Sequence, residues 1–83
     1  MLERRELDRE VLETLLIKID GVKKKKISPR DLILFAGRYR NSVSPEVSKI
    51  LEECLEYGVA LLPDHLNRIE QEAHRALGKI RNA

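Results

Sequence analysis

Residues 28–40 read SPRDLILFAGRYR, and this stretch decides how the rest of the chain is interpreted. Ser28 can cap a helix through its hydroxyl, Pro29 suits the first helical position, and Asp31 can reach back to the cap. The five residues after Asp31 are all apolar, so they surround the helix and leave only one narrow polar sector. We therefore predict a helix over 29–40 that lies at the centre of the fold.

Upstream of this stretch, apolar residues at helical spacing predict a helix over 2–19. Gly21 is expected to end that helix, because glycine tolerates the left-handed conformation of a helix terminus. Arg4 and Asp8 are opposite charges four residues apart and are expected to pair on its polar face. The following residues, 21–27, contain a run of four lysines and are predicted to form a basic loop.

Downstream, Ser44 and Pro45 repeat the start signal of the first stretch. They predict a helix over 45–61, which passes a glycine and stops before the next proline. Asp64 is expected to cap a last helix over 64–81.

The last predicted helix has apolar residues spaced alternately four and three apart, which is the spacing of a coiled-coil seam. This seam either closes a bundle within the chain or pairs with a second chain. No segment alternates apolar and polar residues with period two, so strands are not expected. We predict one all-α domain over 1–83, a bundle of three to four helices. The seam residues are Leu62, Leu66, Ile69, Ala73, Ala76 and Ile80.

Composition limits the class of protein. With 83 residues the chain has room for one domain, and Cys54, its only cysteine, cannot form a disulfide within the chain, which fits a reducing compartment. The first ten residues are too charged for a signal peptide, and no apolar run reaches the length of a membrane span. We therefore expect a cytoplasmic protein without a membrane segment. Dense Arg, Lys and Glu with little Asn and Gln resemble the composition of hyperthermophile proteins.

Charge is distributed unevenly along the chain. Residues 18–40 contain eight basic and two acidic residues, a charge of +6, whereas the whole chain carries only +2. A local field of this kind attracts polyanions, and an aromatic residue between two arginines is typical of surfaces that stack on bases. The candidate nucleic-acid-binding residues are Lys23, Lys24, Lys25, Lys26, Arg30, Arg38, Tyr39 and Arg40.

Each of these signals has an alternative interpretation. The lysine run is equally explained as a solvated loop between two helices. Tyr39 lies near Leu32 on the helical wheel, so its ring is also expected at the rim of the core. A helix-turn-helix interpretation is disfavoured, because the helix over 45–61 carries four glutamates and one lysine, and an acidic helix is repelled by a DNA backbone.

No residue pattern indicates an enzyme or a cofactor. His65 and His74 are nine residues apart on one helix and point in different directions, so they do not form a metal-binding pair. Cys54 lies in an apolar stripe, where a free cysteine behaves as a small apolar residue. There is no glycine-rich phosphate loop, no Ser, His, Asp set and no inward-facing pair of carboxylates in the prediction. We expect a protein without catalysis, metal, cofactor or small-molecule substrate.

Two functions remain. The first is a small nucleic-acid-binding or nucleic-acid-associated accessory protein that contacts the phosphates of DNA or RNA through residues 18–40, with little sequence specificity. The second is a helical adaptor or subunit whose basic segment faces an acidic protein. Ile17, on the back of the first helix, and the small size of the domain also allow a homodimer or another protein partner.

Overall fold

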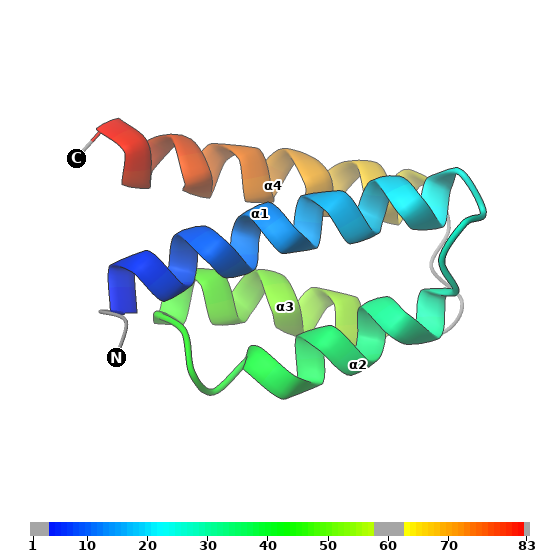
Figure 1. Ribbon diagram of the computed structural model, residues 1–83, viewed down its shortest axis with the longest axis horizontal. Helices are drawn as coiled ribbons and strands as arrows, with labels where there is room; N and C mark the ends of the chain where they lie inside the picture. Colours follow the sequence, from blue (N-terminus) through cyan, green and yellow to red (C-terminus); the bar gives the residue numbers. More distant parts are fainter. Residues whose placement is uncertain (1–3, 58–62, 83) are drawn as a thin grey trace.

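The computed structural model describes residues 4–57 and 63–82, which form four helices and no strand (Figure 1). The predicted all-α bundle is therefore confirmed. The described part measures 33 × 22 × 20 Å. The helices are α1 (Arg4–Lys23), α2 (Pro29–Tyr39), α3 (Pro45–Tyr57) and α4 (Pro63–Asn82).

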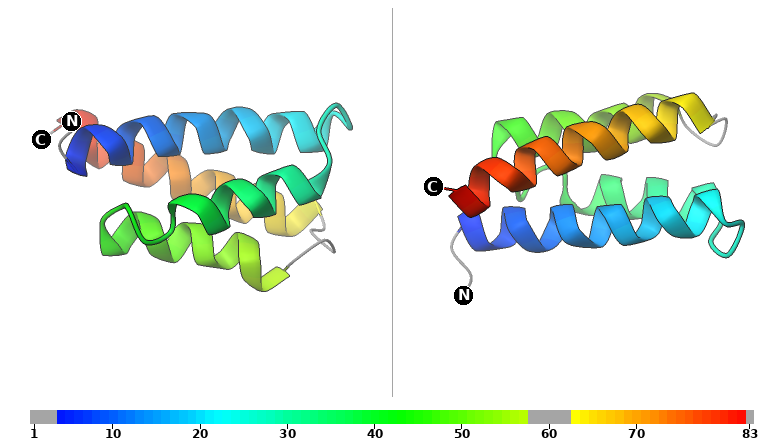
Figure 2. Two further views of the ribbon diagram at one scale, coloured as in Figure 1. Left: turned by 60° about the horizontal axis from the view of Figure 1, so that its bottom comes forward. Right: turned by 90° about the horizontal axis from the view of Figure 1, so that it is seen from above.

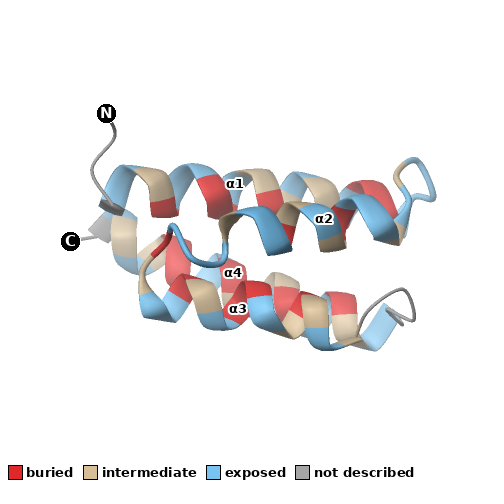
Figure 3. Ribbon diagram, turned by 90° about the horizontal axis from the view of Figure 1, so that it is seen from below, coloured by how far each residue is buried: buried red, intermediate tan, exposed pale blue. Residues whose placement is uncertain are grey.

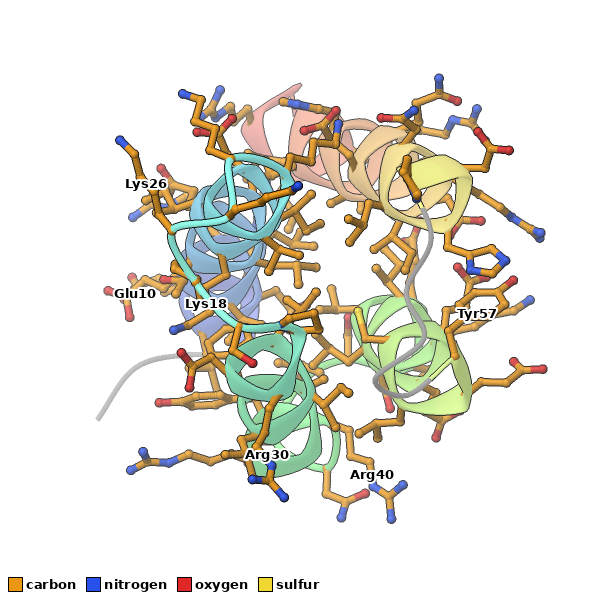
Figure 4. The ribbon with its side chains drawn as sticks, turned by 90° about the vertical axis from the view of Figure 1, so that its right-hand side faces the viewer. Glu10, Lys18, Lys26, Arg30, Arg40 and Tyr57 are labelled. Carbon is orange, nitrogen blue, oxygen red and sulfur yellow. The ribbon has the colours of Figure 1, made fainter. Side chains whose placement is uncertain are left out.

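The four helices stand at the corners of a square when the bundle is viewed along its length (Figure 4). Each helix packs against two neighbours, so α1 touches α2 and α4, and α3 touches the same two helices (Figure 2). The prediction that the helix over 29–40 is central is wrong, because α2 occupies one corner. It fully buries only Leu32 and Ala36, and Leu34 is 64% exposed. A helix that is apolar on all sides still turns one face to the core when its fold has no central position.

The core runs along the axis of the square, where the buried residues of all four helices face inward (Figure 3). The seam of α4 belongs to this core, so its residues pack within the chain. Leu62 lies outside the described residues, and Ile80 is partly buried against the core. The largest fully buried side chains are those of Leu12, Leu15, Ile19, Leu32, Val47, Leu51, Cys54 and Ile69.

The end of α1 differs from the prediction. The helix continues through Gly21, and the left-handed residue that follows it is Lys25, with φ 60°. The amide of Lys26 donates to the carbonyl of Gly21 at 2.8 Å, and that of Lys25 donates to the carbonyl of Val22 at 3.1 Å, the pair of bonds that defines a Schellman cap. The glycine is required for another reason: a Cβ at position 21 would lie 2.8 Å from Cγ1 of Ile27, which packs directly on the helix.

The two Ser-Pro starts are capped in different ways. The Ser28 hydroxyl accepts from the amide of Arg30 at 3.2 Å, as predicted for the start of α2. At the start of α3, however, the amide of Ser44 donates to Oδ1 of Asp8 at 2.9 Å. Asp8 is only 5% exposed, so its expected place on the polar face of α1 is wrong. It is the one buried charged residue in the described part of the chain.

The remaining boundaries lie close to those predicted. α3 is described as far as Tyr57, and its predicted extension to residue 61 falls on residues 58–62, outside the described residues. α4 begins at Pro63, so Asp64 lies in its first turn, where a carboxylate still interacts favourably with the helix dipole. No helix in the described ranges is both long and apolar enough to cross a membrane.

Candidate nucleic-acid interface

The lysine run is divided between two environments. Lys23, in the last turn of α1, places its Nζ 2.9 Å from Oε1 of Glu70, and this ion pair links α1 to α4. Lys24 pairs with Asp20 at 3.0 Å on the same helix end. The side chains of Lys23 and Glu70 are only 28% and 29% exposed, so this lysine has a structural partner already. Both ion pairs reduce the charge that these two lysines present to a ligand.

Lys25 and Lys26 lie beyond α1 and are exposed. Neither forms an ion pair with any residue in the described ranges. Lys26 points outward from the end of the bundle, away from the core (Figure 4). All four lysines are exposed, and Lys25 and Lys26 are the two that form no ion pair within the described ranges.

The outer face of α2 carries the arginines of the segment. Arg30, Leu34 and Arg38 follow each other at intervals of four residues, so they form one stripe on the helix surface, and all three are exposed. At 1.5 Å per residue, Arg30 and Arg38 are separated by about 12 Å along the helix axis. Arg40 follows as the C-cap residue, and both Arg30 and Arg40 point away from the bundle (Figure 4). The stripe connects the lysine loop at one end of α2 to Arg40 at the other.

The sequence allowed Tyr39 either at the rim of the core or beside arginines on the surface, and its position in the structure has features of both. It is half-buried, and its ring lies 5.1 Å from that of Phe35 with an angle of 51° between the rings. The guanidinium of Arg38 lies over the Tyr39 ring, 5.6 Å from its centroid, while the Lys18 ammonium lies 5.5 Å from the centroid of Phe35. Both rings therefore pack against the core, and each has a cation close to its ring.

These rings also line a groove between α1 and α2 with a volume of about 440 Å³. Glu10 and Lys18 contribute from α1, where they lie on the same side of the bundle (Figure 4). Asp31 and Leu34 contribute from α2. Sequence reasoning missed this groove, because the separation of two helices depends on packing between residues far apart in the chain.

The other half of the bundle contains an unpredicted pair of carboxyl groups. Oε2 of Glu53 on α3 and Oε2 of Glu72 on α4 are buried and find no donor among the described residues. Burial, together with the neighbouring Glu72 carboxyl, raises the pKa of Glu53 from 4.5 to about 7, although Arg68 opposes the shift. The prediction that no inward-facing carboxylate pair exists is therefore wrong. Each glutamate flanks the apolar stripe of its own helix, and only the register between α3 and α4 brings the two together.

The histidines and the cysteine have ordinary surroundings. His65 stacks on Tyr57, with centroids 3.7 Å apart and rings 9° from parallel, while His74 is exposed. Cys54 is buried, and burial raises the pKa of its thiol to about 12, with a further contribution from Glu53. Within the described ranges no group of three or more His, Cys, Asp or Glu side chains is placed to bind a metal.

Comparison with known proteins places the chain in no established class. No protein-family model, curated protein or solved structure matches it.

Proposed function

We propose that this chain is a non-enzymatic nucleic-acid-associated protein that holds phosphate groups on the outer surface of α2 and the adjoining loop. The observation that carries this proposal is a set of exposed cations that form no ion pair within the described ranges and lie along one element. We call this set the basic stripe. It consists of Lys25, Lys26, Arg30, Arg38 and Arg40.

Phosphate binding suits unpaired cations, because each cation that neutralises a phosphate releases condensed counterions. A lysine already bonded to a carboxylate, such as Lys23, has to give up that bond first. The basic stripe therefore supplies most of the affinity, and Lys23 and Lys24 supply less than their charge suggests. Contacts to phosphates carry little information on base sequence.

The acidic half of the bundle supports one orientation on a polyanion. α3 carries four glutamates and one lysine, and it lies at the corner beside α2. A nucleic-acid strand is attracted to the stripe and repelled by α3. It is therefore expected to follow the α1 side of α2.

The test is binding of a mixed-sequence oligonucleotide, followed by fluorescence anisotropy between about 50 and 200 mM salt. Replacing Arg30, Arg38 and Arg40 with Gln should weaken binding and reduce the slope of log affinity against log salt. The reduction should reach up to about 0.7 to 0.9 for each phosphate that the variant no longer neutralises. Lys49→Gln is the matched control, because it removes one exposed cation from α3 and should leave the slope nearly unchanged.

Two results would contradict the proposal. One is an absence of measurable binding at low salt by the folded parent protein. The other is an equal reduction of slope per charge in the stripe variant and in Lys49→Gln, which would indicate attraction to net charge instead of binding at a site.

A second candidate function rests on two exposed apolar side chains. Ile17 on α1 is 69% exposed and Leu34 on α2 is 64% exposed, and these are the large apolar residues that the described surface leaves open. Such residues favour a protein partner, including a second copy of the chain. Light scattering at micromolar and tenfold higher concentration tests self-association: a mass of 9.6 kDa at both concentrations would leave only a partner of different sequence.

A further inference from the structure

The groove between α1 and α2 lies beside the basic stripe and differs from it in chemistry. Arg38 belongs to both surfaces, since it is part of the stripe and also lines the groove. The groove wall includes the two aromatic rings of α2, Phe35 and Tyr39. The lining of the groove therefore combines the cations of Lys18 and Arg38 with two aromatic rings.

Two carboxylates determine what part of a ligand can enter. Glu10 and Asp31 line the groove from opposite helices. A phosphate inside the groove would be repelled by both, whereas a neutral planar group would not. The phosphate therefore stays with Arg38 and Lys18, and the neutral part of the ligand lies against the rings.

We infer that this groove holds an unpaired nucleobase, so that single-stranded nucleic acid is the preferred ligand of the basic stripe. The inference rests on the proposed function and narrows it to one class of substrate. A base in a duplex has both faces covered by its neighbours, so only an unpaired base can lie on the ring of Tyr39. Base stacking on an aromatic ring tolerates any base, which agrees with phosphate contacts of low sequence specificity.

Arg38 has two roles in this arrangement. Its guanidinium lies over the half-buried Tyr39 ring, 5.6 Å from the ring centroid, in the free protein. When a base takes that place, the long side chain moves its charge to the phosphate attached to the same nucleotide. Lys18 stands at 5.5 Å over the neighbouring Phe35 ring and is placed to hold the next phosphate.

The test compares a single-stranded oligonucleotide with the duplex of the same sequence at one salt concentration. The parent protein should bind the single strand more tightly. Tyr39→Leu should weaken single-strand binding by roughly 5- to 100-fold, the range of one stacked base, and should change duplex binding little. Its salt slope should equal that of the parent, because no charge is removed. Tyr39→Phe keeps the ring and should bind the single strand like the parent.

A spectroscopic signal separates stacking from a general change in fold. The chain contains two tyrosines and no tryptophan, so in a Tyr57→Phe background Tyr39 is the only tyrosine. Its emission should be quenched by the single strand and not by the duplex, and circular dichroism should show that each variant retains its helices.

Equal affinity for single strand and duplex, or unchanged single-strand binding in folded Tyr39→Leu, would overturn the inference and leave the basic stripe as a phosphate site. Failure of the parent to bind either form would instead overturn the proposed function. The two failures are therefore distinguished by the parent protein alone.

Discussion

The two halves of the bundle place their charges in opposite ways. In the half formed by α1 and α2, Lys26, Arg30 and Arg40 point into solvent (Figure 4). In the half formed by α3 and α4, the carboxyl groups of Glu53 and Glu72 each bury one oxygen. Exposed cations contribute little to folding, but two half-buried carboxyl groups, each with one unpartnered buried oxygen, are a direct cost. We therefore expect Lys26, Arg30 and Arg40 to be replaceable with little effect on stability, whereas the stability contributed by the second half depends on the charge of Glu53.

The largest expected effect concerns leucines from both halves. Leu32 on α2 and Leu51 on α3 are fully buried, so replacing either with Ala should cost about 2 to 5 kcal/mol of unfolding free energy. Leu34 is only two residues from Leu32 but is 64% exposed, so Leu34→Ala should lower the unfolding free energy by less than about 0.5 kcal/mol. Urea denaturation of the three variants measures this. A large decrease in the unfolding free energy of Leu34→Ala would show that the outer face of α2 contributes to folding.

The next effect concerns a hydrogen bond between the two halves, from the start of α3 to α1. Asp8 on α1 accepts from the amide of Ser44 at the start of α3, and Asp8→Ala would leave that half-buried amide without this partner. We expect a decrease of about 1 to 3 kcal/mol in the free energy of denaturant unfolding. Ser44→Ala is the control, because it keeps the amide and should cost less.

Ser28→Ala removes the hydroxyl that caps α2 and should cost about 1 kcal/mol.

A pH-dependent effect is expected in the half formed by α3 and α4. Since the pKa of Glu53 rises from 4.5 to about 7 on folding, the folded state binds this proton more tightly than the unfolded state. The stabilising contribution is complete below pH 4.5 and is lost as the pH rises through 7. We expect a decrease in stability of about 1 kcal/mol between pH 5 and pH 8, because solvent screens part of the effect at a partly open site.

Chemical denaturation at the two pH values, in the parent and in Glu53→Gln, measures this contribution. The variant cannot ionise, so the difference between the two pH values should shrink. Glu52→Gln, an exposed neighbour on α3, is the control and should behave like the parent. An identical pH dependence in all three proteins would remove Glu53 from the explanation. The groups that face Glu53 are Glu72 and Arg68 on α4 and Glu56 on α3.

The smallest expected effect lies in the basic half. Lys25 has φ 60°, which glycine adopts at lower cost, so Lys25→Gly should stabilise the protein by about 0.5 to 1 kcal/mol. It should also lower the salt slope of oligonucleotide binding by less than one unit. Thermal unfolding and anisotropy measure the two quantities on the same variant. A gain in stability with unchanged binding would remove Lys25 from the basic stripe.

Local signals were sufficient for much of the fold. The cap at Ser28 and the apolar spacing of α4 are local signals, because each depends on residues only a few positions apart in the chain. Sequence alone therefore predicts both. Contacts between distant residues were not predictable in this way. Asp8 meets Ser44 across 36 residues, and Glu53 meets Glu72 only through the register of α3 against α4.

The same distinction between local signals and contacts of distant residues applies to the candidate site. The exposure of Lys25 and Arg30 follows from their charge, and sequence reasoning predicted both as phosphate contacts. The ion pair of Lys23 with Glu70, and the groove that exposes Tyr39 to a ligand, depend on how α1 lies against α4 and α2. The usual preference of glycine predicts Gly21 at the helix end, yet Gly21 lies within α1, where a Cβ would clash with the side chain of Ile27.

The Schellman cap lowers the conformational entropy that the loop would lose on binding a ligand. Hydrogen bonds from Lys24, Lys25, Lys26 and Ile27 back to the last turns of α1 fix the backbone of the loop before any ligand arrives. A flexible lysine tail would lose backbone conformational entropy on binding, about 1 to 2 kcal/mol for each residue that becomes ordered. If the loop binds a polyanion as proposed, only the side chains of Lys25 and Lys26 would remain to be ordered, and the loop would act as a preorganised receptor and not as a segment that folds on contact.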